Sequence, residues 1–410
     1  MAIGIIVITL LIMSTGRAPL YLTAVLGGVA ALLADGVPLS GESVDTVSTI
    51  LKGALHPLPV VDMLGVLLFI GIMKQSGCMD TILRALMRIG RHQGGAPGIA
   101  AAAAFTAALL GTLSAYTQPA LTAAVAGPAA VRLGMQPKEA AGMISLANAL
   151  SNACSFTHPT FVAVLAVTGV SFGLINVLGF FGVMWILIFA YFRVRRDLKR
   201  RGVTRQYNDD GTGVISRSAV WLAVLPFLIL CGGIMADVPI FLAGIVAGLF
   251  VCLMKRMTLT HGESAMMSGI SIPIMAALSL LFLASVMDRV GFTDAVVRLA
   301  KPFMMVAPIQ ILYIISALTG LLTQSSSASA AVVLPVTQAA IQMGCEPLDV
   351  TFAAVTGCAV MQLFMTGGAV TSLSLVVKVI PGAVQRDANL WQRPIILADA
   401  AVCFLMTFFI

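Results

Sequence analysis

Apolar runs of about 20 residues follow one another along almost the whole chain, with short polar turns between them. A helix of that length crosses the hydrocarbon core of a bilayer. The pattern therefore predicts an all-α, polytopic membrane protein. We expect complete spans at residues 2–16, 20–35, 60–74 and 173–192 in the first half, and at 217–235, 238–254, 268–287 and 393–410 in the second.

Polar turns interrupt other apolar segments in both halves. One lies within Gly111 to Pro128 (GTLSAYTQPALTAAVAGP), and a similar one lies within Gly320 to Pro335 (GLLTQSSSASAAVVLP). Non-helical backbone at membrane depth is tolerated only where it lines a cavity or is buried in protein. We expect these turns to be the tips of two re-entrant hairpins, whose arms are 96–113 with 119–132, and 304–322 with 330–343.

Two further regions have the pattern of broken helices. The apolar segments 139–151 and 159–170 are separated by Ser151 to His158, and the region 348–380 is interrupted in a similar way. Residues 75–91 and 289–302 are too charged to cross a bilayer and suit helices that lie in the interface before each hairpin. The expected fold has about ten transmembrane helices, two re-entrant hairpins and two broken helices.

The chain contains an internal repeat. Met73, Gly77, Asp80 and Arg84 recur as Met287, Gly291, Asp294 and Arg298 at a constant spacing of 214 residues, and Gly134 and Pro137 recur as Gly344 and Pro347 at a spacing of 210. The repeat divides the chain into residues 1–205, a linker at 206–213 and residues 214–410. Each half is expected to cross the membrane five times, with four complete spans and one broken helix. An odd number of crossings predicts that the second repeat is inverted relative to the first.

Basic residues favour one side of the membrane. With the linker in the cytoplasm, 20 of the 24 Lys and Arg residues fall in cytoplasmic segments, and only Lys52, Arg289, Arg298 and Lys301 fall outside. This bias predicts that both termini lie outside. It also accounts for the net charge of +7 without a nucleic-acid partner.

The composition excludes several classes of function. The chain is 59% hydrophobic and 10% charged, and it has no long polar segment for a soluble catalytic or nucleotide-binding domain. The seven cysteines have no metal-ligand spacing, and no paired carboxylates or Ser-His-Asp arrangement indicate an enzyme. We expect a protein that is not an enzyme and has no cofactor. Whether it binds sodium ions is not decided by the composition.

The hairpin tips and helix breaks are the candidate binding site for a small anion. Pro119 and Pro159 suit the first turns of helices whose free N–H groups point back at the polar turns, and such N-termini bind carboxylates. The sequence places no Arg or Lys near these turns. The expected substrate-binding residues are Ser114, Tyr116, Thr117, Gln118, Asn152, His158, Ser325, Ser326, Ser327, Gln362 and Thr366.

Oxygen-bearing side chains in the same turns could hold a coupling cation. Sodium is a hard cation that takes oxygen ligands. Its candidate ligands are Ser114, Asn148, Asn152, Thr323 and Gln362, of which Asn152 and Gln362 correspond at the 210-residue spacing. For a proton, the candidates are His158 and Asp399, with helix capping and a structural contact to a neighbouring helix as the respective alternatives.

This layout resembles the ion transporter superfamily, which includes divalent anion/sodium symporters, C4-dicarboxylate carriers, citrate transporters and the large subunits of tripartite (TRAP) carboxylate transporters. The segment Gly71 to Gly142, with GIMKQSGCMDTILRAL leading into the first hairpin, looks most like the TRAP large-subunit and C4-dicarboxylate carrier patterns. The tips read Ser114-Ala115-Tyr116-Thr117 and Ser325-Ser326-Ser327, whereas the sodium symporters have Ser-Asn-Thr. The coupling ion and the substrate therefore stay open.

The resemblance implies an elevator-type transporter. A transport domain, residues 93–192 and 303–410, would move against a scaffold, residues 1–92 and 214–302. It also implies a homodimer in the inner membrane of a bacterium. We expect a secondary active transporter that couples a small di- or tricarboxylate-like anion to sodium or protons. The alternatives are a cation/proton antiporter without an organic substrate and a membrane subunit of a multi-component carboxylate transporter.

Overall fold

The computed structural model describes residues 1–15, 18–40, 46–54, 58–114, 118–203, 216–236, 238–269, 272–365 and 372–410. Every regular element in these ranges is an α-helix, which confirms the all-α prediction. By length and composition, three of the described helices could cross a membrane, or up to five if each bent pair is one span. Seven shorter apolar helices accompany them, so the count of about ten spans stays a prediction.

The first half contains eleven helices in the described residues. They are α1 (Ala2–Thr15), α2 (Leu20–Ala34), α3 (Val47–Ala54), α4 (Leu58–Gln75), α5 (Cys78–Ser114), α6 (Gln118–Arg132), α7 (Pro137–Ser145), α8 (Ala147–Ala153), α9 (Pro159–Thr168), α10 (Leu174–Val183) and α11 (Trp185–Arg200). Gly95, with φ 58° and ψ −138°, divides α5 into the predicted interfacial segment and the first hairpin arm.

The second half follows the same order with ten described helices. They are α12 (Arg217–Met235), α13 (Ile240–Met254), α14 (Leu259–Gly269), α15 (Ile272–Arg289), α16 (Phe292–Met304), α17 (Pro308–Thr323), α18 (Ser326–Gln342), α19 (Pro347–Met361), α20 (Ser372–Val379) and α21 (Gln385–Met406). The hairpins are α5 with α6 and α17 with α18, and the broken helices are α7 to α9 and α19 with α20.

Several boundaries differ from the predictions, and the last helix begins at Gln385 instead of near residue 393. The span expected to end at residue 192 continues as α11 to Arg200, because Arg193 and Asp197 face each other one turn apart and basic residues are favourable at a helix C-terminus. The short helix α3 lies between the spans expected at 20–35 and 60–74, and α14 lies mostly between those expected at 238–254 and 268–287, so neither was expected as a helix.

Residues that match between the halves have the same local conformation. Gly77 and Gly291 both have a left-handed backbone, with φ of 73° and 71°, at the turn between a long helix and the interfacial helix after it. Glycine adopts this conformation without the steric cost that a side chain brings. Gly134 and Gly344 also have positive φ, and Pro137 and Pro347 each begin the next helix.

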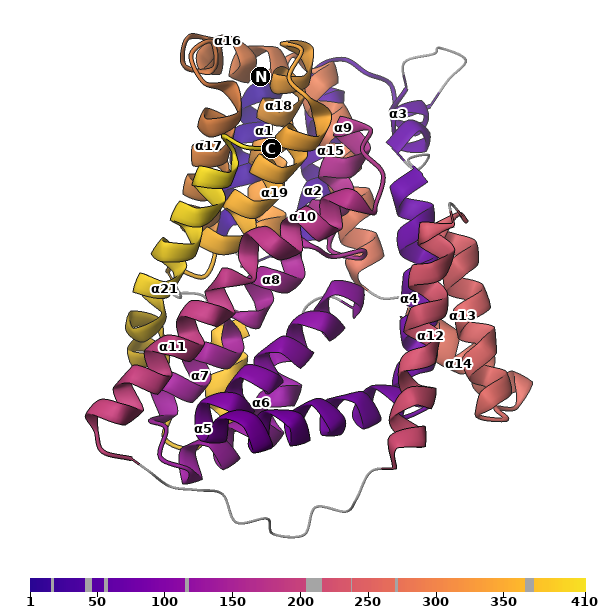
Figure 1. The fold of residues 1–410 in the computed structure, drawn as a ribbon. Helices are drawn as coiled ribbons and strands as arrows, with labels where there is room; N and C mark the ends of the chain where they lie inside the picture. Colours follow the sequence, from indigo (N-terminus) through magenta and orange to yellow (C-terminus); the bar gives the residue numbers. More distant parts are fainter. Residues whose placement is uncertain are drawn as a thin grey trace.

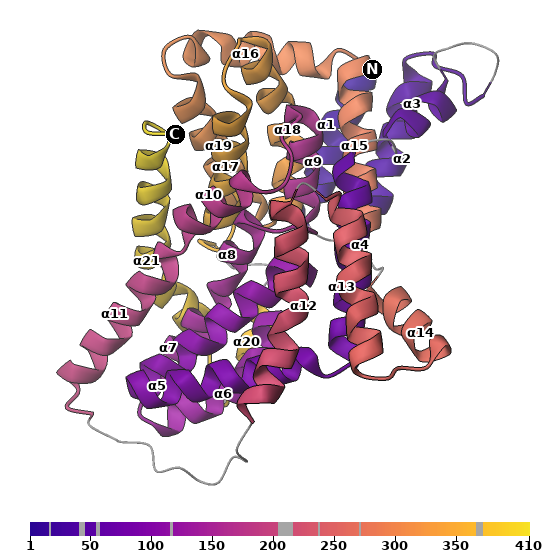
Figure 2. The ribbon, with the colours of Figure 1, turned by 45° about the vertical axis from the view of Figure 1, so that its right-hand side comes forward.

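The two hairpins lie at opposite ends of the molecule. In both views, α5 and α6 are at the lower end, whereas α16 and the beginning of α17 are at the upper end (Figures 1 and 2). Both chain termini lie in the upper part, and α11 ends and α12 begins at the lower end. The two termini therefore share one side of the molecule, opposite the ends that flank the predicted linker.

Contacts between the halves occur in reciprocal pairs. Helix α2 packs on α15 and α4 on α13, while α9 packs on the hairpin helix α18 and α6 on α20. Glycines allow some of these helices to approach closely: a Cβ on Gly65 of α4 would lie 2.4 Å from Cα of Phe241, and one on Gly244 of α13 would lie 2.5 Å from the carbonyl oxygen of Gly65. Elements of the two halves thus form one packed core.

Candidate transport site at the two helix breaks

The first break lies between α8 and α9. The carbonyl oxygen of Cys154, just after α8, accepts a hydrogen bond of 3.1 Å from the side-chain amide of Asn176 in α10. The hydroxyl of Ser155 accepts backbone N–H groups of Thr157 at 3.1 Å and His158 at 2.9 Å. These bonds satisfy backbone groups that the interruption leaves without helical partners, which is required at membrane depth.

The first break is bound to the first hairpin. The backbone N–H of Phe156 and the hydroxyl of Ser155 both donate to the carbonyl oxygen of Thr112 in α5, at 2.7 Å and 3.0 Å. One residue earlier, a Cβ on Gly111 would lie 2.7 Å from Cβ of Ser151 in α8, so the two helices are in close contact. The break and this hairpin arm therefore form one unit.

The second break follows α19, and α21 supplies its partners. The side-chain amide of Gln392 donates to the carbonyl oxygen of Leu363 at 2.8 Å. The carbonyl oxygen of Phe364 accepts bonds from the Asn389 amide at 3.1 Å and from Arg393 Nε at 3.2 Å. Asn389 thus has the role at the second break that Asn176 has at the first.

Gln392 also connects the two broken helices. This residue is fully buried, and its amide oxygen accepts a hydrogen bond of 3.0 Å from the hydroxyl of Ser145 at the end of α7. The hydroxyl of Ser372, at the beginning of α20, donates to the carbonyl oxygen of Ser145 at 3.4 Å. A buried polar network therefore links α7, α20, α21 and the end of α19.

The second hairpin turns at Gln324, which has a left-handed backbone with φ of 55°. Ser325 is the N-cap of α18, and its hydroxyl accepts the N–H of Ala328 at 3.3 Å. The hydroxyl of Thr323 lies 2.8 Å from that of Ser329 and donates to the carbonyl oxygen of Ser325 at 2.9 Å. Helix α17 packs on α19, where a Cβ on Gly320 would lie 2.9 Å from the carbonyl oxygen of Cys358.

The predicted binding residues lie at the ends of these helices. Ser114 ends α5, Gln118 begins α6, Asn148 and Asn152 lie in α8, and His158 is the N-cap position of α9 without a side-chain capping bond. Thr323 ends α17, Ser326 and Ser327 begin α18, and Gln362 follows α19. Tyr116, Thr117 and Thr366 lie outside the described residues. Asn152, His158 and Gln362 are buried, whereas Asn148, Thr323 and Ser325 are half-buried.

The expectation that no basic residue lies near the turns is wrong. Arg393 reaches the second break from α21: its Nε also donates to Asn389 at 3.1 Å, and its guanidinium carbon lies 5.2 Å from the centre of the Phe364 ring. The side chain is half-buried. The sequence did not indicate this contact because Arg393 is at the beginning of the last expected span and the helix packing alone brings it to the break.

The sequence analysis also missed Asn176, Asn389 and Gln392. All three are buried amides on helices next to the breaks. An isolated amide in an apolar helix is a signal for an interhelical hydrogen bond, although the pattern does not identify the partner. Among the described residues, no group of three or more His, Cys, Asp and Glu side chains could hold a metal ion.

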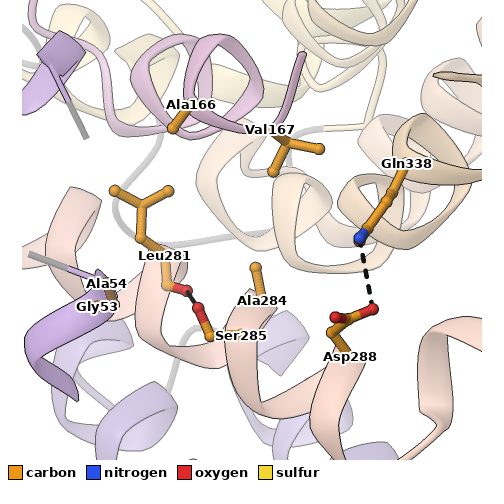
Figure 3. Close-up of a pocket in the computed structure, with 9 residues that line it drawn as sticks. All are labelled: Gly53, Ala54, Ala166, Val167, Leu281, Ala284, Ser285, Asp288 and Gln338. Atoms are coloured by element: carbon orange, nitrogen blue, oxygen red, sulfur yellow. Dashed lines mark hydrogen bonds between the residues drawn. The ribbon is translucent and has the colours of Figure 1, made fainter. Parts of the chain in front are cut away.

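A cavity of about 300 Å³ lies apart from the breaks, between the predicted scaffold and transport domains (Figure 3). Gly53 and Ala54 of α3 and four residues of α15 line it on one side, and Ala166 and Val167 of α9 and Gln338 of α18 line the other. The Gln338 amide donates to Asp288 Oδ1 at 3.4 Å across the cavity. None of the predicted binding residues is among these lining residues.

Two solved transporter structures share this fold. The YdaH transporter of Alcanivorax borkumensis has a TM-score of 0.68 and 15% sequence identity, over 95% of this chain and 96% of that chain. MtrF of Neisseria gonorrhoeae, from a class of antimetabolite efflux pumps, has a TM-score of 0.62 and 13% identity, over 95% of this chain and 92% of that chain. No protein-family model and no curated protein matches the chain.

At these identities, the likeness establishes the fold. Both of these solved structures with the same fold are membrane transporters, and the fold agrees with the helical membrane protein that the sequence predicted. YdaH and MtrF are not among the carriers that the sequence resemblance named. The comparison therefore does not support the resemblance to the ion transporter superfamily.

Proposed function

We propose that the protein is a secondary active transporter that moves a small carboxylate across the membrane, coupled to sodium or protons. The observation that carries this proposal is the pair of helix breaks, each tied to other helices by side-chain amides and each packed against a hairpin arm. Broken helices of this kind expose backbone groups that can bind substrates and ions in transporters.

Two features support an anionic substrate. The α9 N-terminus at the first break presents N–H groups without helical acceptors, which favours negative charge. Arg393 at the second break supplies a fixed positive charge, and guanidinium groups bind carboxylates with two parallel hydrogen bonds. Asn152 and Gln362, at corresponding places in the two halves, are our leading contacts for substrate or sodium.

An inverted repeat and an elevator movement are parts of this proposal. The reciprocal packing of α2 on α15 and α4 on α13, and of α9 on α18 and α6 on α20, is what an inverted pair of repeats produces. Small side chains at Gly53, Ala54, Ala166 and Ala284 line the cavity between the two proposed domains. Such a face offers little steric resistance to sliding. We also propose a homodimer with both termini outside, in a bacterial inner membrane.

Transport assays in proteoliposomes test the function. We expect labelled succinate or citrate to accumulate when a sodium gradient or a pH gradient is imposed separately, and not when both are absent. If no di- or tricarboxylate is taken up, and a cation gradient instead changes the pH inside the vesicles, the protein would be a cation/proton antiporter. Uptake that requires added partner proteins would indicate a subunit of a multi-component system.

Variants at the two breaks test the site. Asn152→Ala and Gln362→Ala should abolish uptake without loss of folded protein. Arg393→Gln should weaken carboxylate binding by roughly tenfold or more, because a hydrogen bond to a charged group contributes about 1.5–3 kcal/mol, and Arg393→Lys should retain part of it. Arg386→Gln, in the first turn of the same helix, is the matched control. Near-normal uptake by the three break variants would refute the site assignment.

Export of an antimetabolite is a second candidate function, favoured by the likeness to MtrF. The same vesicles distinguish it from import. Cells that produce the protein would then accumulate less of a carboxylate-bearing antimetabolite than cells with the Asn152→Ala variant, whereas imposed gradients would not drive succinate or citrate inward.

A further inference from the structure

Asp399 is a carboxyl group buried in the interior of the last helix. Its exposed fraction is 0%, and neither carboxyl oxygen has a hydrogen-bond partner among the described residues. The backbone amide of Ile186 in α11 faces the carboxyl without meeting the geometry of a hydrogen bond. An ionised carboxylate in such a place costs several kcal/mol unless it is paired. The surroundings of this side chain therefore favour the neutral, protonated carboxyl over the carboxylate.

The groups that face Asp399 are neutral. Tyr313 of α17 and Cys403 of α21 lie close enough to interact with it electrostatically, and Cys358 of α19 lies beside Tyr313. The Cys403 thiol donates to the carbonyl oxygen of Gly182 in α10 at 3.3 Å.

The charged groups of the surrounding helices lie elsewhere. Arg193 of α11 stacks on Trp391, and Arg393 lies six residues before Asp399, about 9 Å along the helix axis. Glu139 of α7 pairs with Arg201 at 2.7 Å, and Lys378 lies in the last turn of α20. Within the described residues, these helices place no cation against the Asp399 carboxyl.

The Tyr313 hydroxyl is bonded to the backbone next to Asp399. Its hydroxyl donates to the carbonyl oxygen of Ala400 at 2.8 Å, and Ala400 directly follows Asp399. If Asp399 lost its proton, the carboxylate would become a much stronger acceptor than that carbonyl, and the tyrosine hydroxyl would turn to it. Deprotonation would thus move Tyr313 and the helix that carries it.

Helix α17 connects this place to the tip of the second hairpin. Ser316, Thr319 and Ser329 surround the thiol of Cys358, and the hydroxyl of Ser329 meets that of Thr323 at 2.8 Å. Thr323 in turn bonds the backbone of Ser325 at the tip. Hydroxyl and thiol groups therefore occur along the whole interface from Tyr313 to the proposed substrate site.

We propose that Asp399 binds the proton that drives transport, and that Tyr313 and α17 transmit its protonation state to the second hairpin. The proposal rests on the proposed transport function and names the coupling ion. With the proton bound, the Tyr313 hydroxyl stays bonded to the Ala400 carbonyl oxygen and the second hairpin keeps the position seen in the structure. When the proton is released, the hydroxyl is drawn to the Asp399 carboxylate and the hairpin shifts.

Infrared spectroscopy of the reconstituted protein tests proton binding without a substrate. We expect the wild type to have the C=O stretching band of a protonated carboxyl that disappears as the pH is raised, and Asp399→Asn to lack this band. Asp387→Asn, an exposed residue of the same helix, is the matched control and should retain it. The absence of such a band in the wild type, or its persistence in Asp399→Asn, would overturn the proposal.

Transport of labelled succinate or citrate tests the coupling. Asp399→Asn should keep exchange of internal for external substrate and lose at least about tenfold of the accumulation driven by a pH gradient, a size typical of coupling between sites. Tyr313→Phe keeps the ring and should lose coupling in the same way. It is the test variant if Asp399→Asn does not fold. Wild-type accumulation by either folded variant would refute the coupling. If the wild type transports neither compound, the proposed function fails, and the infrared result still decides whether Asp399 binds a proton.

Discussion

At each helix break, one asparagine satisfies carbonyl groups that the helix has released. The Asn176 amide donates to the carbonyl oxygen of Cys154, and the Asn389 amide donates to that of Phe364. Both N···O distances are 3.1 Å. In a bilayer, water cannot replace such a donor. Side-chain donors from neighbouring helices therefore make an irregular backbone possible at these breaks.

Removing the first amide should destabilise the protein. We expect Asn176→Ala to lower the free energy of unfolding by about 1–3 kcal/mol, because a buried carbonyl loses its donor. Thermal unfolding in detergent measures the loss. Asn148→Ala removes an amide from a half-buried position of α8 and is the control, and an equal loss for both variants would contradict the assigned role of Asn176.

Between elements, glycines set how closely a hairpin arm approaches its broken helix. A Cβ on Gly320 of α17 would lie 2.9 Å from the carbonyl oxygen of Cys358 and 3.3 Å from the backbone nitrogen of Gln362. Backbone atoms cannot turn aside as a flexible side chain can. The position of the second hairpin on α19 therefore depends on this residue.

We expect Gly320→Ala to lower stability by about 1–3 kcal/mol, the usual cost of overpacking, and to reduce uptake because the tip shifts with α17. Gly232→Ala is the matched control, since a Cβ on Gly232 of α12 would meet no atom within 4 Å. The unfolding midpoint and the uptake of labelled succinate are the two readouts. An unchanged midpoint for Gly320→Ala would show that α17 and α19 can separate without cost.

Across the whole molecule, the proposed scaffold and transport domains meet around the cavity in Figure 3. The Asp288–Gln338 hydrogen bond joins α15 to α18 across it. If α18 slides past α15 during transport, a covalent tie at this place must stop the cycle.

Asp288→Cys combined with Gln338→Cys provides that tie. A short bis-thiosulfonate reagent, which forms a disulfide with each cysteine and releases sulfinate, should cross-link the pair and lower uptake by at least about tenfold, the loss expected when a required domain movement is blocked. A reductant cleaves these disulfides and should restore uptake. Each single variant, treated in the same way, controls for reaction at the native cysteines. Undiminished uptake by the cross-linked protein would rule out this sliding movement.

The sequence by itself determined most of the helical elements and the two places where the long helices break. Run lengths of apolar residues, Gly77 and Gly291 at matched turns, and Pro159 at the beginning of α9 are local properties, and local backbone preferences act on them whatever the rest of the chain does. The same local signals placed the second hairpin tip between residues 322 and 330, and the chain turns within that stretch, at Gln324 and Ser325.

Only the tertiary structure decided which polar groups meet. Ser145 and Gln392 are 247 residues apart in the chain, and Arg393 reaches the second break only because α21 packs beside α19. The isolation of Asp399 likewise results from the packing of α10, α11, α17 and α19 around α21. Such contacts depend on the relative positions of whole helices, which the hydrophobic pattern of any one helix does not specify.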